Sequence, residues 1–184
     1  MSRKFHVCVF CGARSGNNPA YVAAASALGR RIGERELGLV YGGACVGLMG
    51  VLADAALAAG APVRGVLPRS LSSVEVAHAG LTELVLVDGL HARKARMTAE
   101  SDAFLAMPGG FGTMDELFEA LTWSQLGLHT RPLGLLNVDG FYDALVASMD
   151  RQVRDGFVTI ADRSRLAVES EPDALLDALG APRG

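Results

Sequence analysis

The stretch AFLAMPGGFGTMDELFEALTW (residues 103–123) joins an apolar run to an acidic segment through three glycines within four residues. The apolar run at 103–107 is typical of a buried strand, and the periodicity after the glycines predicts a helix from Thr113 to about Leu126. Glycine tolerates positive φ and lets backbone N–H groups come close to a ligand. The stretch therefore predicts a strand, a loop that can approach a ligand closely, and a helix.

The rest of the chain repeats this alternation of short apolar runs and alanine-rich amphipathic segments. Strands are expected at 5–10, 37–43, 62–68, 81–87, 102–110, 131–140 and 165–170, and helices at about 20–36, 47–59, 90–101, 113–126, 141–156 and 172–179. Nearly continuous apolar strands that alternate with helices predict a parallel sheet covered on both faces. We therefore expect one doubly wound α/β domain over residues 1–184, with ligands at the carboxyl ends of its strands.

Composition and charge exclude several classes of protein. Half of the 184 residues are apolar, which is ample for a core, but no apolar run approaches the ~20 residues that span a bilayer. The apolar part of the amino-terminal segment MSRKFHVCVFCG is too short for a signal peptide, so we expect a cytoplasmic protein without a membrane partner. The net charge is −3 with interleaved acids and bases, which argues against a nucleic-acid partner.

Cys8 and Cys11 form a Cys-x-x-Cys pair, which raises the alternatives of a redox site or a zinc site. In an extended segment, residues three apart point to opposite faces, and no second Cys pair is present, so we favour a structural role. The four histidines are scattered without metal-ligand spacing. We expect neither a metal nor a cofactor.

Three glycine-rich loops each follow an expected strand and open an expected helix: CGARSGNNP (11–19), YGGACVGLMG (41–50) and MPGGFGT (107–113). A helix amino terminus offers unpaired N–H donors and a partial positive charge, which suits phosphate. One such loop is an ordinary connection, whereas three at one sheet edge favour an anion site. In the third, Thr113 is a candidate N-cap that places Asp115 and Glu116 in the first helical turn.

Two familiar nucleotide signatures are absent from these loops. The chain has no Gly-x-x-x-x-Gly-Lys-Ser/Thr, which argues against a P-loop nucleotidase. GGACVG (42–47) lacks the register of Gly-x-Gly-x-x-Gly, which argues against a dinucleotide oxidoreductase.

Two charged positions suggest chemistry. Arg93 lies near the start of an expected helix, where a cation opposes the helix dipole; a solvated basic face, shared with Arg96, is the ordinary explanation, and phosphate binding is the functional one. Glu116 either stabilises its own helix or serves the reaction, by holding a sugar hydroxyl, activating water or stabilising a developing cation. Glycosidic cleavage develops such a cation in its oxocarbenium-like transition state.

Several motifs together resemble the Lonely Guy family. They are VFCG, YGG…VGLMG, ADAALAAG, E…AHAGLTEL, H.RKA.M, SDAF…PGGFGT..E and TWSQLGLH…GLLNVDGFYD, and they run from about residue 5 to 179. The resemblance implies a Rossmann-like fold and a phosphoribohydrolase that acts on an N6-modified adenosine 5′-monophosphate. Such an enzyme releases the free base, an active cytokinin, and ribose 5-phosphate. The resemblance also implies a homodimer or larger homo-oligomer, with the pocket near the subunit contact.

The resemblance makes Arg93 and Glu116 the catalytic pair. It implies nucleotide contacts by Gly42, Gly43, Gly47, Glu75, Lys94, Gly109, Gly110, Phe111, Gly112, Thr113, Met114, Asp115 and Thr122. The chain departs from the family pattern at Ala44, where glycine is usual, at Ala92, where glutamate is usual, and at Arg96, which often corresponds to an acidic residue. These departures leave both catalytic candidates in place.

Three other functions are weighed against this one. A general purine or pyrimidine mononucleotide nucleosidase fits the same motifs. A non-catalytic nucleotide or molybdenum-cofactor carrier would share the glycine loop, but the retained Arg93 and Glu116 favour catalysis. A lysine decarboxylase, a label the family has carried, needs pyridoxal phosphate on a lysine, and the chain has only Lys4 and Lys94.

Overall fold

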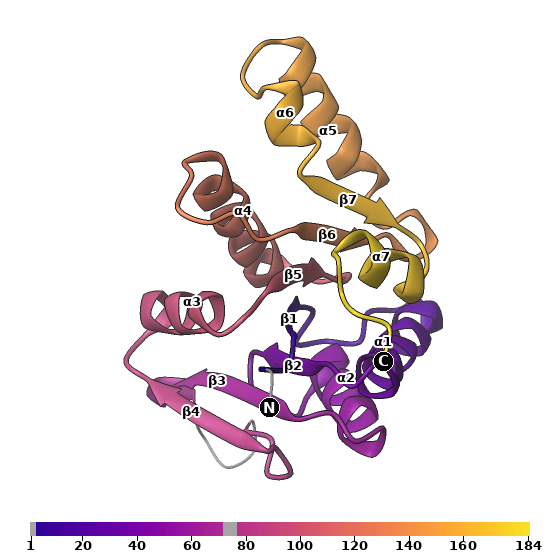
Figure 1. Cartoon of the computed structure of the whole chain (residues 1–184), viewed down its shortest axis with the longest axis vertical. Helices are drawn as coiled ribbons and strands as arrows, with labels where there is room; N and C mark the ends of the chain where they lie inside the picture. Colours follow the sequence, from indigo (N-terminus) through magenta and orange to yellow (C-terminus); the bar gives the residue numbers. More distant parts are fainter. Residues whose placement is uncertain (1–2, 72–76) are drawn as a thin grey trace.

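A parallel sheet of seven strands in the order β4-β3-β2-β1-β5-β6-β7 organises the computed structural model, which describes residues 3–71 and 77–184 (Figure 1). The strands are β1 (His6–Phe10), β2 (Gly38–Tyr41), β3 (Val63–Pro68), β4 (Glu83–Val87), β5 (Ala103–Ala106), β6 (Leu133–Leu136) and β7 (Leu166–Glu169). Every neighbouring pair is parallel. The predicted doubly wound α/β fold is confirmed.

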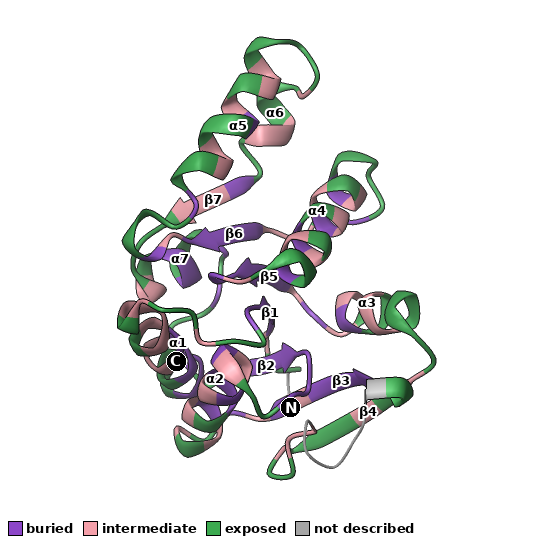
Figure 2. Ribbon diagram, turned by 180° about the vertical axis from the view of Figure 1, so that it is seen from behind, coloured by how far each residue is buried: buried purple, intermediate pink, exposed green. Residues whose placement is uncertain are grey.

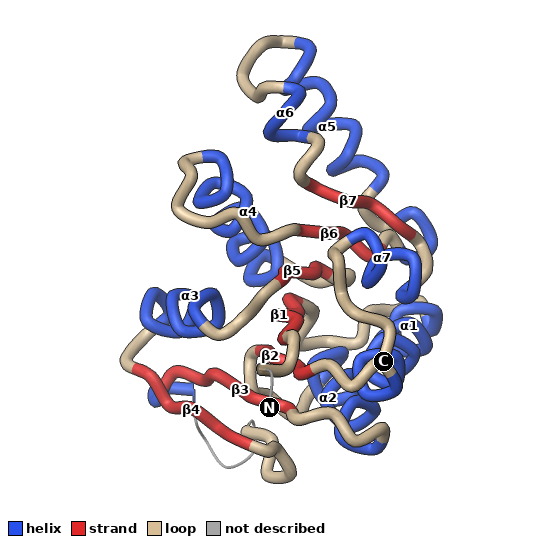
Figure 3. Tube along the Cα trace, in the orientation of Figure 1, coloured by secondary structure: helices blue, strands red, loops and turns tan. Residues whose placement is uncertain are grey.

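Helices cover both faces of the sheet, as Figures 1 and 3 show. One face carries α1 (Pro19–Glu34), α2 (Gly47–Ala58) and α7 (Pro172–Ala178), and the other carries α3 (Leu90–Ala99), α4 (Phe111–Gln125) and α5 (Asp143–Arg154). The helix α6 (Ile160–Arg163) and the 3-10 turns η1 (Arg69–Leu71) and η2 (Val138–Gly140) were not predicted. Each is three or four residues long, too short for a periodic signal. Among the described helices none is long and apolar enough to cross a membrane.

The central strands are buried on both sides, whereas the edge strand β4 is largely exposed (Figure 2). This double burial explains the Cys-x-x-Cys pair. Cys8 packs in the core under α3 and α4, and Cys11 packs in the core under α1 and α2, so the predicted opposite orientation is confirmed. Burial raises the pKa of both thiols, which keeps them protonated and inert.

The direction of winding reverses between β1 and β5. From β1 the chain adds β2, β3 and β4 on one side, and then crosses to β5, β6 and β7 on the other. The strand ends are tied together at this point, since the amide of Met107 donates to the carbonyl of Phe10 (2.9 Å). Such a switch point leaves a crevice at the carboxyl ends of the strands, which is where ligands bind in open α/β sheets.

Candidate active site

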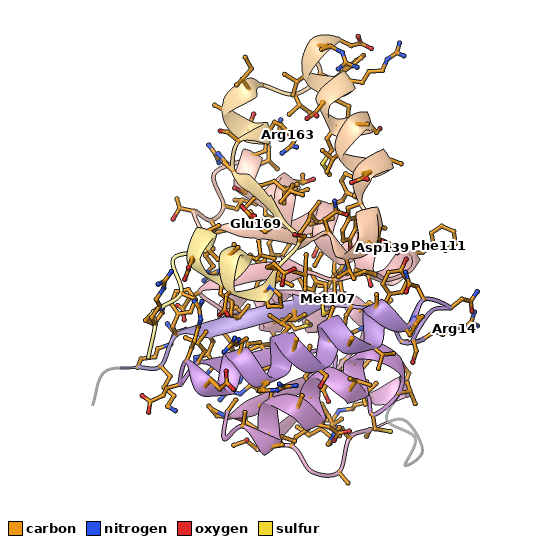
Figure 4. All side chains as sticks on the ribbon, turned by 90° about the vertical axis from the view of Figure 1, so that its right-hand side faces the viewer. Arg14, Met107, Phe111, Asp139, Arg163 and Glu169 are labelled. Carbon is orange, nitrogen blue, oxygen red and sulfur yellow. The ribbon has the colours of Figure 1, made fainter. Side chains whose placement is uncertain are left out.

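A cleft of about 550 Å³ opens at this switch point. It is lined by Cys11, Gly12, Ala13, Arg14, Ser15, Gly16, Tyr21, Leu48, Met49, Arg93, Pro108, Gly109, Gly110, Phe111, Gly112, Thr113, Glu116 and Phe141. Figure 4 shows Arg14 and Phe111 at one edge of the molecule, with Met107 inside it. The predicted convergence of the glycine loops at one sheet edge is confirmed.

The three glycine loops hold one another in place through close backbone contacts. The amide of Gly12 donates to the carbonyl of Pro108 (3.1 Å), and its own carbonyl accepts from the amide of Leu48 (3.1 Å). Gly47 has φ of +59° and lies so close to the backbone of Ala13 that a Cβ would overlap it. A side chain at Gly47 would push the first two loops apart, so glycine at this position sets the shape of the cleft.

The helix α4 begins at Phe111, with Gly110 as its N-cap and without a side-chain cap. The prediction that Thr113 is the N-cap is wrong, and so is the placement of Asp115 and Glu116 in the first turn. Gly110 adopts an extended conformation (φ −99°, ψ −153°), which allows the helix to start two residues early. The amides of the first turn have no acceptor within the helix, and a Cβ at Gly110 or at Gly112 would meet nothing within 4 Å. Bare amide donors therefore line an open part of the cleft.

Arg93 of α3 and Glu116 of α4 meet in the wall of the cleft. Their side chains are 15% and 10% exposed, and Arg93 Nη2 lies 3.4 Å from Glu116 Oε1. Arg93 Nε also donates to the carbonyl of Val66 in β3 (3.1 Å). Burial raises the pKa of the Glu116 carboxyl, and the charge of Arg93 opposes that rise.

Gly42 and Gly43 lie behind the cleft rather than in its lining. A Cβ at Gly42 would overlap the guanidinium of Arg93, so this glycine makes room for the Arg93–Glu116 pair. Gly43 has φ of +81° and faces Leu67 and Leu84. Nucleotide contacts by Gly42, Gly43 and Gly47 stay predictions.

Four further residues that the resemblance assigns to the nucleotide lie outside this cleft, namely Lys94, Met114, Asp115 and Thr122. Lys94 Nζ contacts Asp115 Oδ2 (3.1 Å) and Glu119 Oε2 (2.7 Å), and the hydroxyl of Thr122 donates to the carbonyl of Phe118 (2.7 Å). A separate, shallow depression on α4 is lined by Met114, Asp115, Phe118, Glu119, Thr122 and Trp123. Glu75 lies outside the described residues.

Arg14, Tyr21 and Phe141 line the cleft but were not among the predicted site residues. Tyr21 and Phe141 meet edge to face, with ring centroids 5.7 Å apart. The hydroxyl of Tyr142 donates to the carbonyl of Met107 (2.6 Å), which fixes this wall to the end of β5. Arg14 stands on the first glycine loop. The loop at residues 11–19 was predicted to face the ligand. No motif or spacing in the sequence marks Arg14, Tyr21 or Phe141 as part of the site.

The three departures from the family pattern lie away from the lining. Ala44 is buried, forms an isolated bridge with Ala77, and does not have a positive φ. Ala92 is exposed, and Arg96 forms an ion pair with Glu100 on α3. None of the three is among the described residues that line the cleft.

Comparisons with known proteins identify relatives of this chain. A family model described as "possible lysine decarboxylase" matches residues 49–179. A cytokinin riboside 5′-monophosphate phosphoribohydrolase from Arabidopsis thaliana is 47% identical, over 94% of this chain and 80% of that protein. The enzyme of the same name from Rhodococcoides fascians is 48% identical, over 96% of this chain and 89% of that protein. The chain belongs to the cytokinin riboside 5′-monophosphate phosphoribohydrolase family. The resemblance to the Lonely Guy family is thereby confirmed.

Solved structures with lower sequence identity share the fold of this phosphoribohydrolase family member. The molybdenum cofactor carrier protein from Chlamydomonas reinhardtii superposes with a TM-score of 0.73, at 21% identity over 97% of both chains. The molybdenum cofactor binding protein from Rippkaea orientalis gives a TM-score of 0.71, at 22% identity over 94% of this chain and 93% of that one. At such identities the likeness concerns the fold alone.

The residues do not fit the pyridoxal phosphate that the decarboxylase description implies. A Schiff base needs a deprotonated lysine amine. Lys94 is held by two carboxylates. Burial lowers its pKa, but the hydrogen bonds that it donates to Glu119 and Asp115 outweigh burial and raise the pKa overall. Lys4 is exposed and precedes β1, and neither lysine lines the cleft.

Proposed function

We propose that this chain hydrolyses the N-glycosidic bond of a cytokinin riboside 5′-monophosphate in the cytoplasm and releases the free base and ribose 5-phosphate. One observation carries the proposal: the buried carboxyl of Glu116 and the bare amides at the start of α4 line the same cleft. The carboxyl suits a developing cation, and the amides suit an anion. A nucleotide that loses its base presents an anionic phosphate and a ribose that develops positive charge.

The start of α4 binds the phosphate in this proposal. Residues 110–113 offer amides without intrahelical acceptors, and the helix dipole adds a partial positive charge. Phosphate bound at one end orients the ribose at the other, so that binding energy from a remote group lowers the barrier to reaction.

Glu116 acts on the ribose. As the bond between C1′ and the base nitrogen breaks, the electron pair leaves with the base, and positive charge develops on C1′ and the ring oxygen. The ionised Glu116 carboxylate stabilises that charge. Water then adds its hydroxyl to C1′, and its proton goes to the departing base. Arg93 orients the carboxylate and favours its ionised form by opposing the effect of burial on its pKa.

A panel of nucleotides tests the proposal. The purified enzyme is incubated with N6-isopentenyladenosine 5′-monophosphate, AMP, CMP and the matching nucleosides, and free base is measured by chromatography. We expect base release from the N6-modified monophosphate and much less from its nucleoside. Equal turnover of AMP and CMP would instead support a general mononucleotide nucleosidase. Tight binding without release would support a carrier.

We also infer that the enzyme is a homodimer or larger. Lys94, Asp115 and Thr122 lie beside the shallow depression on α4, next to Phe118, which is 40% exposed. If these residues contact nucleotide, as the family resemblance implies, they do so in the cleft of a second copy.

Mixing two inactive variants tests this arrangement. Glu116→Gln disables the cleft, and Thr122→Arg fills the depression. A heterodimer of the two retains one intact site if cleft and depression come from different copies, so mixing should restore activity. Lack of restoration in a mixture shown by mass spectrometry to exchange subunits would contradict a shared site.

A further inference from the structure

The cleft has little net charge to offer a phosphate unless one exposed arginine takes part. Among the described residues that line it, the charged side chains are Arg14, Arg93 and Glu116. Arg93 and Glu116 compensate each other at 3.4 Å. A phosphomonoester carries close to two negative charges at neutral pH. Arg14 is the remaining cation that can balance them.

Arg14 has a fixed backbone and an unused side chain. Gly47 packs against the backbone of residues 13 and 14, and a Cβ at Gly12 would lie only 3.4 Å from the Cα of Gly109. The loop that bears Arg14 is therefore locked to the loop that precedes α4. The side chain is exposed and extends outward at the edge of the molecule in Figure 4, and it forms no ion pair or hydrogen bond within residues 3–71 and 77–184.

Arg93 is not equally available for this task. Its Nε is committed to Val66, and its Nη2 faces Glu116. Turning the guanidinium toward phosphate would leave the buried Glu116 without its partner, which is strongly unfavourable. The two arginines of the cleft thus have separate surroundings: Arg93 is held against the carboxylate, whereas Arg14 lines the same cleft without a side-chain partner among the described residues.

We propose that Arg14 binds the 5′-phosphate together with the first-turn amides of α4 and is the residue that makes the enzyme select nucleotides over nucleosides. This inference rests on the proposed function and assigns a residue to its phosphate subsite. A guanidinium can bind two phosphate oxygens at once, which fixes orientation as well as charge.

The test compares Arg14→Met and Arg14→Lys with Arg154→Met, a matched loss of charge at an exposed position on α5. Calorimetry measures the binding of ribose 5-phosphate, and steady-state kinetics measure turnover of N6-isopentenyladenosine 5′-monophosphate and of its nucleoside. We expect Arg14→Met to raise both the Kd and the KM for the phosphorylated compounds about tenfold, with kcat within about twofold. Arg14→Lys should recover part of the loss, and the nucleoside should be turned over as before.

The outcomes separate this inference from the function on which it rests. If Arg14→Met binds and turns over nucleotides as Arg154→Met does, the inference is wrong and the proposed function stands. A loss in kcat shared by nucleotide and nucleoside indicates a structural role and also overturns the inference. If the wild-type enzyme binds ribose 5-phosphate but releases no base, the proposed function fails, while the Kd comparison still decides the role of Arg14. If the wild type binds no ribose 5-phosphate, both fall.

Discussion

Two ion pairs join the same two helices, α3 and α4, yet their physical chemistry is opposite. Arg93 meets Glu116 in the wall of the cleft, and the next residue, Lys94, meets Asp115 and Glu119 outside the cleft. At the outer pair, hydrogen bonds outweigh burial and raise the pKa of Lys94, so the ion pair is favourable. At the inner pair, burial dominates and raises the pKa of Glu116, so the charged form of this carboxyl is less favourable than it is in water.

The difference indicates that the two pairs serve different ends. A stabilising pair keeps its charges in partial contact with water, as the outer one does. A carboxylate in a cleft gives up part of its solvation, which does not stabilise the fold. Carboxyls with a pKa perturbed in this way cluster at functional sites, where their charge serves binding or catalysis. We interpret the outer pair as a clamp between helices and the inner pair as catalytic machinery.

Removing the charge at the inner pair should have the largest effect. We expect Glu116→Gln to lower kcat for base release by about 10³-fold, since a positioned group of this kind contributes 10²–10⁴. The amide keeps the size of the side chain, so circular dichroism should match that of the wild type. Turnover within about threefold of the wild type would refute the role of Glu116.

Glu116→Gln should also change the thermal stability of the protein, and the sign of the change follows from the pKa of Glu116. Because the pKa of Glu116 is raised in the folded state, ionisation costs stability as the pH rises through that pKa. Glu116→Gln lacks this cost. Its Tm at pH 7.5 should equal or exceed that of the wild type, and the difference should shrink toward about pH 3, where the carboxyl is largely protonated in both the folded and the unfolded state. A lower Tm at pH 7.5 would show that the carboxylate stabilises the fold.

Removing the cation of the inner pair should have the next largest effect. Arg93→Met takes away the charge that lowers the pKa of Glu116. The acid limb of the pH–rate profile should move to higher pH, and kcat at pH 7 should fall about 10²-fold. An acid limb that stays in place would mean that a different group titrates in the reaction.

A smaller loss should follow when the space behind Arg93 is filled. Gly42→Ala places a methyl group where the guanidinium now lies, whereas Gly112→Ala adds a methyl group where nothing stands within 4 Å. We expect Gly42→Ala to lower kcat about tenfold by displacing Arg93, a misplacement effect. Gly112→Ala lies in the proposed phosphate site, so it should raise KM but, unlike Gly42→Ala, retain most of kcat. Equal effects of the two would contradict the packing of Gly42 against Arg93.

The outer pair should give the smallest catalytic effect. Lys94→Met leaves Asp115 and Glu119 without their shared cation. We expect a loss of about 1 kcal/mol in the free energy of unfolding in urea, at the upper end for a surface pair screened by solvent. Its kcat should remain within about threefold of the wild type, unlike that of Glu116→Gln. A fall in kcat comparable to that of Glu116→Gln would erase the distinction between the two pairs.

The sequence predicts the fold well because its strands are nearly continuous apolar runs between amphipathic helices. The run at residues 5–10, for example, contains β1 (His6–Phe10), and the predicted opposite burial of Cys8 and Cys11 holds. The start of α4 was placed two residues late because Thr113 is a good capping residue by type. The conformation of Gly110, which the surrounding loops determine, overrides that local preference.

The site is less predictable because contacts between distant segments build it. The approach of Arg93 to Glu116 depends on Gly42 and on the carbonyl of Val66, neither of which lies near either residue in sequence. The pairing of Tyr21 with Phe141 likewise joins α1 to the turn after β6. Residue type and spacing identify Glu116 as a candidate, but only the packed structure shows that burial raises its pKa.

The most direct test of nucleotide binding in the cleft is a crystal structure of the Glu116→Gln variant with intact N6-isopentenyladenosine 5′-monophosphate. We predict that the phosphate accepts hydrogen bonds from the amides at the start of α4, within residues 110–113, and that C1′ faces the side chain at position 116. A phosphate bound away from residues 110–113, or a ribose turned away from position 116, would contradict it.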